Sequence, residues 1–391
     1  MEIFQNTNFD FLGRRRYFIA LSLVLMVVGA VSLILKGGPK LGIDFKGGTL
    51  VYAKFKESPK LDDIRSALTS QGLSVATLQP FEEAGGSHEL KIDLDLSEEA
   101  ALTSGKEVIT RTLHTLYPGQ EGKLDFNNAS PEAVADRLKS NGKLAGSGLS
   151  SEEIEKSATA LVAFRDAPPR SGLLKEFSEA ASVPGVNPDI ISALQEEAYL
   201  GDFTIRGIEV VGPKVGADLQ WQALKATLFA LGAMLLYIAF RFESVYGVAA
   251  VIAVFHDVFV TVGFFSLFDR EIELTVIAAL LTLVGYSMND TIVIFDRMRE
   301  NLKLTRRTSL EALMNQSLNQ TLARSVLTSG LTFIAVLCLF LFGGEVLRGF
   351  SFALVVGVVV GSYSSIFVAS PIVLWWRSAA YARVAKGRAA R

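Results

Sequence analysis

The amino-acid sequence predicts a polytopic α-helical membrane protein with six transmembrane helices and an α+β, ferredoxin-like domain that contains a helical insertion. The first observation is composition, because half of the 391 residues are hydrophobic and the mean hydropathy is positive. The second is distribution, since the apolar residues gather into six runs, most of them near the length that crosses a bilayer core of about 30 Å. The third is one long polar stretch between the first two runs.

Each apolar run is expected to form one span. The runs cover residues 17–35, 226–240, 245–268, 274–295, 325–342 and 350–376. The second run is short, so we expect its helix to begin at Trp221, an aromatic residue suited to the membrane interface. The predicted segments are an N-terminus at 1–16, a first helix at 17–36, an external domain at 37–221, helices two to six within 222–376 and a basic tail at 377–391.

The placement of Lys and Arg predicts the orientation. Three arginines at 14–16 precede the first span and five basic residues lie within 296–323, whereas the short loops of the opposite side hold only Arg270 and Arg348. Cytoplasmic loops are enriched in Lys and Arg, so both termini are expected in the cytoplasm. The first run is too long for the h-region of a signal peptide and lacks a small-residue cleavage site, so it is expected to remain as an anchor.

Charge and cysteine content narrow the function classes. Residues 37–221 hold 19 Lys or Arg and 28 Asp or Glu, a balance of 19 − 28 = −9, while the whole chain carries −2. The external domain is therefore acidic and the cytoplasmic face basic, and the sequence shows no pattern typical of nucleic-acid binding. The single cysteine, Cys338, excludes a disulfide within the chain and makes thiolate ligation of a metal implausible. His88 and His114 lack metal-ligand spacing, and no cofactor is predicted.

The external stretch begins and ends with strand patterns. Alternating or β-favouring residues and one amphipathic helix predict a strand–helix–strand–strand order with a late closing strand, which is typical of a ferredoxin-like sandwich. The elements expected are a strand at Leu50–Phe55, a helix at Leu61–Leu68, and strands at Ser74–Phe81, Glu89–Leu96 and Phe203–Val211. The glycine-rich Gly42–Gly48 lacks the spacing of a phosphate loop, so close backbone packing is the expected role.

The middle of the external domain is predicted to be a helical insertion covering about 97–201. Pro and Gly clusters separate its helices, and Ser130 and Asn187 precede prolines in the manner of N-caps. The helices expected are Ser97–Leu116, Pro131–Leu138, Ser150–Phe164, Leu173–Ala180 and Pro188–Leu200.

Three ionisable residues within the apolar runs are the candidate site. Asp290 lies about 24 Å from the outer end of the fourth span and Arg324 about 27 Å from that of the fifth, so the two are expected at one level and an ion pair is allowed. Asp257, at about 17 Å in the third span, is nearer the midplane. Charged side chains at such depth are costly and mark ion pathways.

This constellation suits proton binding. Desolvation favours a protonated carboxyl group, whereas a nearby guanidinium favours the charged form. A carboxyl group that alternately approaches an arginine and moves away from it would therefore release a proton in the first state and bind one in the second. Asn289, Ser287 and Thr328 are expected to support the relay. Two alternatives stay open: a structural pair that fixes helix register, and an intramembrane aspartyl protease that uses Asp257 and Asp290.

Several motifs together resemble the SecF family, the accessory subunits of the bacterial Sec preprotein translocase. The resemblance covers residues 1–96 and 203–376, and 97–201 departs from it. The motifs are Gly42–Thr49, Val211–Leu219, His256–Val258, Gly285–Thr291, Phe295–Asn301 and Gln320–Ser325.

The resemblance implies a resistance-nodulation-division-like half that works with SecD beside SecYEG, in the bacterial inner membrane. It implies use of the proton-motive force to complete export of a preprotein, and it places Asp290 and Arg324, and more weakly Asp257, in the proton pathway. The external domain would then be periplasmic, and membrane lipid would be a further partner of the spans. A proton-driven exporter of lipid or small molecules and a translocon scaffold without proton coupling remain the alternatives, and no enzymatic activity is expected.

Overall fold

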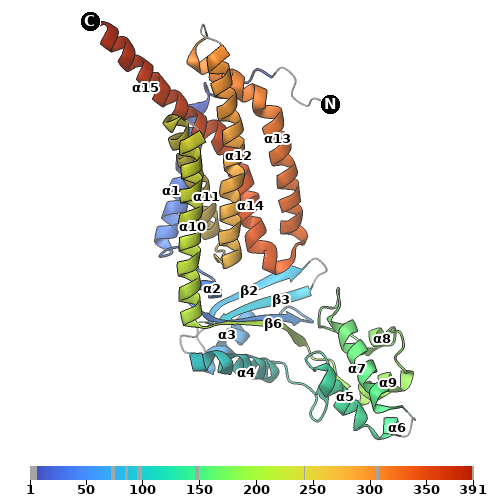
Figure 1. Ribbon diagram of the computed structural model, residues 1–391. Coiled ribbons are helices and arrows are strands. Elements are labelled where there is room, and N and C mark those ends of the chain that lie inside the picture. Colours follow the sequence, from blue (N-terminus) through green and yellow to red (C-terminus); the bar gives the residue numbers. More distant parts are fainter. Residues whose placement is uncertain are drawn as a thin grey trace. The chain divides into compact units, whose positions relative to one another are not determined.

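The computed structural model describes residues 7–71, 75–83, 87–94, 99–145, 149–241, 243–304 and 308–389 (Figure 1). The chain divides into two compact units, one formed by Met1–Gly42 with Asp218–Arg391 and the other by Ile43–Ala217. Several residues used in the sequence predictions lie outside the described ranges. They are Ser74, Leu96, Ser97, two of the basic residues within 296–323 (Arg306 and Arg307) and the last residue of the basic tail, Arg391.

The first unit is a helical bundle, and within the described residues six helices are long and apolar enough to cross a membrane. The membrane fold class is therefore confirmed. The helices are α1 (Arg15–Leu35), α10 (Pro213–Arg241), α11 (Ser244–Leu267), α12 (Leu274–Leu304), α13 (Leu310–Phe342) and α14 (Gly344–Ser364), the last continued by a π-helical turn η1 (Ser365–Ala369) and by α15 (Ser370–Ala389). Helix α10 starts earlier than Trp221, because a proline fits the first turn of a helix.

Small residues let the helices of the bundle approach closely. A Cβ built on Gly29 of α1 would lie 3.0 Å from the Cα of Gly263 in α11, so these backbones are in direct contact. A Cβ on Gly361 of α14 would lie 3.0 Å from the Cβ of Ser287 in α12. Small residues at helix crossings permit such packing in membranes. The consequence is that polar side chains near the end of α14 come within reach of α11 and α12.

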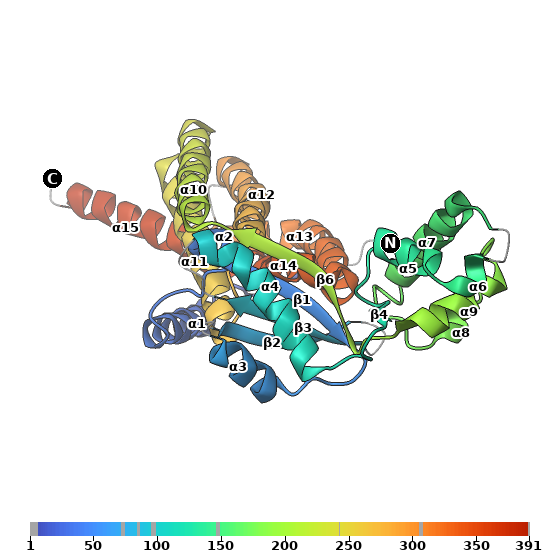
Figure 2. The ribbon, with the colours of Figure 1, turned by 90° about the horizontal axis from the view of Figure 1, so that it is seen from below.

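The second unit contains a four-stranded antiparallel sheet in the order β2-β3-β1-β6. The strands are β1 (Gly48–Phe55), β2 (Val75–Glu83), β3 (Ser87–Leu94) and β6 (Phe203–Val211), and the helices packed against them are α3 (Leu61–Ser70) and α4 (Glu99–Leu116) (Figure 2). This βαββαβ order is ferredoxin-like, as predicted.

Helix α4 corrects the predicted boundary of the insertion. The sequence pattern assigned Ser97–Leu116 to the helical insertion, but Ile109 and Leu113 of α4 are fully buried in the core of the sheet, with Val51 and Phe203. Helix α4 is thus the second helix of the ferredoxin-like fold, and the insertion begins after it. The amphipathic pattern of α4 reveals an apolar face but not the partner that covers it.

The insertion folds around a core of its own. Its elements are β4 (Leu124–Asp125), α5 (Pro131–Lys139), α6 (Gly142–Ala145), α7 (Ser151–Asp166), α8 (Phe177–Ala180), α9 (Pro188–Glu197) and β5 (Ala198–Tyr199). The predicted N-caps are confirmed, since Ser130 accepts from the N–H of Ala133 and Asn187 from that of Asp189. The helix expected from Leu173 begins only at Phe177, because the preceding leucines are buried without helical structure.

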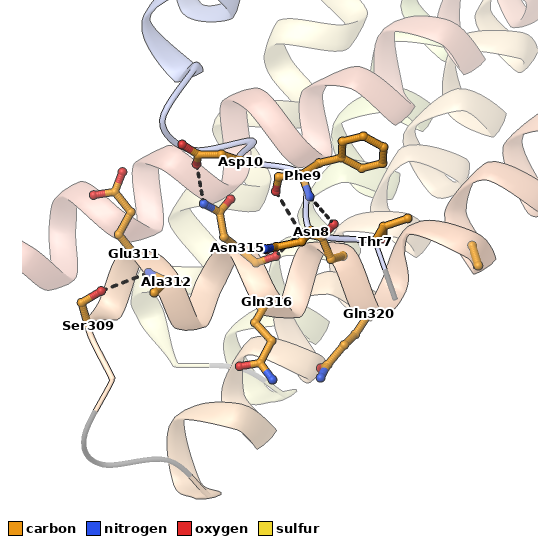
Figure 3. Close-up of a pocket in the computed structure, with 12 residues that line it drawn as sticks. Thr7, Asn8, Phe9, Asp10, Ser309, Glu311, Ala312, Asn315, Gln316 and Gln320 are labelled. Carbon is orange, nitrogen blue, oxygen red and sulfur yellow. Dashed lines mark hydrogen bonds between the residues drawn. The ribbon is translucent and has the colours of Figure 1, made fainter. Parts of the chain in front are cut away.

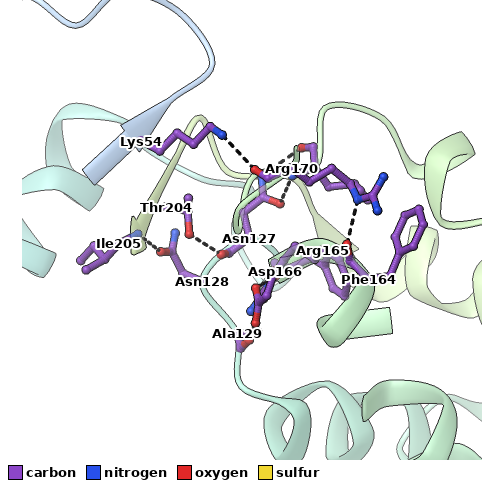
Figure 4. A network of polar contacts seen from close by, with 12 residues as sticks. Lys54, Asn127, Asn128, Ala129, Phe164, Arg165, Asp166, Arg170, Thr204 and Ile205 are labelled. Atoms are coloured by element: carbon purple, nitrogen blue, oxygen red, sulfur yellow. Dashed lines mark hydrogen bonds and ion pairs between the residues drawn. The ribbon is translucent and has the colours of Figure 1, made fainter. Parts of the chain in front are cut away.

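Two asparagines join the insertion to the sheet (Figure 4). The amide of Asn128 donates to the carbonyl of Phe203 at 3.0 Å and accepts from the N–H of Ile205 at 3.1 Å, so it bonds to β6 as a neighbouring strand would. Asn127 donates to the carbonyl of Gly201 at 2.8 Å, and the hydroxyl of Thr204 donates to the carbonyl of Asn127 at 2.8 Å. These buried bonds fix the insertion on the sheet.

The glycine-rich motif packs as predicted. Gly47 and Gly48 follow the short helix α2 (Ile43–Lys46) and have φ angles of +76° and +142°, which favour glycine. A Cβ on Gly216 would lie 3.0 Å from the backbone N of Gly47. Close backbone packing between this turn and the start of α10 is therefore confirmed.

Candidate functional site

The three predicted site residues lie on three helices of the bundle. Asp257 on α11 is 1 % exposed and Asp290 on α12 is 4 % exposed, whereas Arg324 on α13 is exposed. Two carboxylates are therefore buried in one apolar bundle. Their hydrogen-bond partners differ, and that difference decides what each can do.

Asp290 has a small set of partners. The hydroxyl of Ser329 on α13 donates to Oδ2 of Asp290 at 3.0 Å. The hydroxyl of Ser362 on α14 donates in turn to Ser329 at 2.8 Å. Thr328 and the charge of Arg324 also act on this carboxyl group. A hydroxyl partner can donate to a carboxylate and can also accept from a protonated carboxyl. Such a partner tolerates both protonation states.

Arg324 does not pair with Asp290. Among the described residues the two form no ion pair, although the depth estimate allowed one. Ser329, which reaches Asp290, follows Arg324 by five residues, so the arginine lies about 7 Å further along the axis and roughly 140° around the helix. Arg324 instead lines a pocket of about 450 Å³ with Asp296 and Thr321.

Asp257 has a larger set of partners than Asp290. Its Oδ1 lies 2.9 Å from Nδ1 of His256, and its Oδ2 accepts from Ser287 at 2.5 Å and from Ser364 at 2.8 Å. All of these side chains are buried. A carboxylate removed from water is tolerated when several donors satisfy it. Ser364 is the last residue of α14 before the π-helical turn, a type of turn that is frequent at functional sites.

The predicted supporting residues do not act together. Ser287 donates to Asp257 rather than to Asp290. The hydroxyl of Thr328 donates to the carbonyl of Arg324, within its own helix. Asn289 is exposed on the outer side of α12. Helix geometry explains the split, because consecutive helical residues point about 100° apart.

The exposed side of α12 is polar or small along most of its length. Thr282, Gly285, Asn289, Asp296 and Glu300 are exposed and recur at intervals of three, four or seven residues, so they form one stripe. We call these five residues the α12 stripe. The exposed residues of α1, by contrast, are mainly large and apolar. A polar stripe is unsuited to lipid, so this side of the bundle has the character of an interface.

The two carboxylates are not arranged as an aspartyl protease pair. Asp257 and Asp290 have separate donors, and no hydrogen bond joins them in the described part of the chain. Proteases of that class need two carboxylates that share one proton. The geometry therefore gives the protease alternative no support. Within the described ranges, no group of three His, Cys, Asp or Glu could hold a metal ion.

A second polar site holds the N-terminal segment against α13 (Figure 3). The amide of Asn319 both accepts from the N–H of Phe9 and donates to its carbonyl, each at 2.9 Å. The amide of Asn315 donates to Asp10 at 2.6 Å and accepts from the N–H of Leu12 at 3.0 Å. Leu12 is fully buried in the bundle core. These contacts border a pocket of about 670 Å³ and were not foreseen from the sequence.

Other residues of the site were also missed. Ser362 and Ser364 complete the networks of Asp290 and Asp257, but serines are common at helix crossings and carry no signal of their own. One usable signal is present in α13, where hydroxyl residues recur every fourth position from Ser317 to Ser329. Such a row places all its members on one side of the helix.

Sequence and structure comparisons give consistent matches. Residues 191–379 match the family described as protein export membrane protein SecD/SecF, C-terminal, and residues 32–59 match the SecD/SecF GG motif. The protein translocase subunit SecF of Koribacter versatilis is 49 % identical over 96 % of this chain and 93 % of its own length. That of Calditerrivibrio nitroreducens is 34 % identical, covering 95 % of this chain and 96 % of its own.

A solved structure is also similar. The crystal structure of SecDF from Thermus thermophilus, titled a translocon-associated membrane protein, aligns with a TM-score of 0.64 at 30 % identity. The alignment covers 95 % of this chain but 39 % of the SecDF chain. This chain therefore corresponds to well under half of that longer protein.

Proposed function

Because the chain belongs to the SecF family of protein translocase subunits, we propose that it acts with SecD beside SecYEG to complete protein export across the inner membrane. The proton-motive force would supply the energy, and the substrate would be a preprotein. The chain is a multi-pass membrane protein with a transport role. The asymmetric placement of Lys and Arg supports cytoplasmic termini and a periplasmic domain at about 37–221.

The observation that carries the proposal is the environment of Asp290. It is a buried carboxyl group in a membrane-spanning helix that accepts a hydrogen bond from Ser329 and forms no short ion pair with an arginine among the described residues, although the charge of Arg324 acts on it. A carboxyl group in this setting can gain or lose a proton without leaving a strong partner unpaired. Moving one charge across 100 mV is worth about 2.3 kcal/mol, which is enough to shift a conformational equilibrium.

The α12 stripe and Arg324 support a SecD partner. Both are exposed along spans that would otherwise meet lipid, where polar and charged groups are costly. SecD would supply the helices that cover this side, and Asp290 would work within the joined bundle. The SecDF chain, of which this chain matches 39 %, has the length for such a second half.

Export of a secreted reporter tests the proposal in cells whose native subunit is replaced by variants. Asp290→Asn and Arg324→Met are expected to abolish proton-dependent export, while membrane insertion and co-purification with SecD stay intact. Asn8→Ala, at an exposed residue of the N-terminal segment, is the control and should export normally. Normal export by both site variants would favour a scaffold without proton coupling, and loss of lipid or drug efflux instead would favour an exporter.

A further inference from the structure

Helix α13 carries a row of buried hydroxyl groups in its N-terminal half. Ser317, Thr321, Ser325 and Ser329 are 0 %, 7 %, 8 % and 9 % exposed. They recur every fourth residue, so they lie one above another on the helix. We call these four residues the α13 row.

Both ends of the row contact polar residues of α12. The amide of Asn301 donates to the hydroxyl of Ser317 at 2.8 Å, and the hydroxyl of Ser329 donates to Asp290 at 3.0 Å. Asn301 and Asp290 are eleven residues apart, which is close to three full turns, so they lie on one face of α12. The row therefore runs along the α12–α13 interface and ends at the candidate proton site.

Ser325 is the member that packing does not explain. Its hydroxyl is buried and has no hydrogen-bond partner. A buried polar group without a partner costs about 1–3 kcal/mol. The next hydroxyls, on Thr321 and Ser329, are one turn away, about 6 Å, which is too far for a direct bond but suits one bridging water.

A pocket borders the α13 row at Thr321, one turn before Ser325. Thr321 and Arg324 line the pocket of about 450 Å³ together with Asp296, Arg297 and Glu300. Thr321 thus belongs both to the pocket and to the α13 row. The pocket wall is rich in charged side chains, and water is the natural occupant of such a space.

We propose that protons reach Asp290 from this pocket along the hydroxyls of Thr321, Ser325 and Ser329, linked by bridging waters. Each hydroxyl accepts a proton from one neighbour and passes its own to the next, so the net change is one proton added to Oδ2 of Asp290 and one lost from pocket water. No electron moves. Arg324 stands beside the entrance rather than on the route. This inference rests on the proposed role of Asp290 and assigns its path of access.

Cysteine reactivity tests whether water reaches the row. In full-length protein in lipid nanodiscs, with Cys338→Ala as background, Ser325→Cys and Thr321→Cys are treated with a small neutral methanethiosulfonate. Thr261→Cys on α11 is the matched control, because Thr261 is fully buried away from the pocket. Modification at 321 and 325 is expected to be at least about tenfold faster than at 261, since a thiol must ionise in water to react. Equal rates at all three positions would overturn the route.

Protonation kinetics test whether the row conducts. The infrared band of the protonated Asp290 carboxyl group is identified as the band that is missing in Asp290→Asn. Its appearance is then followed over time after a rapid drop in pH. Ser325→Ala and Thr321→Val should slow its appearance by about tenfold or more, because a positioned proton-transfer group contributes about 10² or more in rate. Thr261→Val should not slow it. Unchanged rates in both variants would refute the route while leaving the role of Asp290 intact, whereas absence of any Asp290 band would refute that role.

Discussion

Asp257 and Asp290 are two buried carboxyl groups in one bundle, yet their surroundings differ. Asp257 contacts His256, Ser287 and Ser364, whereas Asp290 accepts a hydrogen bond from Ser329 and interacts more weakly with Thr328 and Arg324. Several buried donors hold a carboxyl group in one geometry. A carboxyl group whose hydrogen-bond partners are hydroxyls can keep them in either protonation state. The comparison suggests that Asp257 organises the bundle and Asp290 exchanges a proton.

Truncation of the two carboxylates should show the largest difference. Asp257→Ala leaves the buried side chains of His256 and Ser287 without this partner, at about 1–3 kcal/mol each, while Ser364 keeps the carbonyl of Gly361. A loss of about 2 kcal/mol or more in the free energy of unfolding is therefore expected. Asp290→Ala leaves only one such hydroxyl and should lose about 1–2 kcal/mol. Unfolding of both variants in mixed micelles measures the difference. Equal losses would contradict the assigned roles.

Single serine substitutions sharpen the same comparison with a smaller effect. Ser364→Ala removes a donor to the buried carboxylate of Asp257, and a bond to a charged group is worth about 1.5–3 kcal/mol. Ser362→Ala removes a donor to a neutral hydroxyl, worth about 0.5–1.5 kcal/mol. The same unfolding measurement should rank Ser364→Ala as the more damaging. The reverse order would show that Asp290, not Asp257, is the fixed group.

A third carboxylate outside the spans should give the smallest effect. Hydrogen bonding from Lys36, with the charge of Lys40, holds the pKa of Asp269 below its usual range. The pKa of an Asp side chain in the unfolded protein is about 4. The stabilising contribution of Asp269 is therefore present above that pH and is lost as the pH falls through the lower pKa of Asp269 in the folded protein. Because the side chain is 65 % exposed, Asp269→Asn should cost about 1 kcal/mol or less at pH 7.

The pH dependence of the stability loss in Asp269→Asn distinguishes the ion pair from other causes. Thermal unfolding of the protein and of Asp269→Asn, compared from pH 7 to pH 3, should converge as the pH falls, and added salt should reduce the difference at pH 7. A gap that widens on acidification would show that the pKa is not depressed.

Sequence reasoning recovered features that depend on composition and local pattern. The six spans, the strands of the ferredoxin-like sheet and the caps at Ser130 and Asn187 follow from apolar period and turn chemistry. It also found Asp290, because a carboxyl group in an apolar run is conspicuous. It misassigned α4, since an amphipathic pattern does not say which core covers the apolar face.

Which residues of the site contact one another was harder to predict than which residues belong to the site. Depth along a helix can be counted from sequence to within about 5 Å, but the direction of a side chain depends on how the helices are rotated against one another. Arg324 was therefore placed beside Asp290, whereas Ser329 contacts it. Ser364 of α14 contacts Asp257 of α11, and Gly361 lets α14 approach α12; these are packing effects that no local pattern contains.

Infrared difference spectroscopy on the protein in lipid tests the central claim most directly. Acidification should produce a protonated-carboxyl band from the membrane interior. We predict that this band disappears in Asp290→Asn and persists in Asp257→Asn. A band that survives in Asp290→Asn and vanishes in Asp257→Asn would contradict the account and make Asp257 the proton-exchanging group.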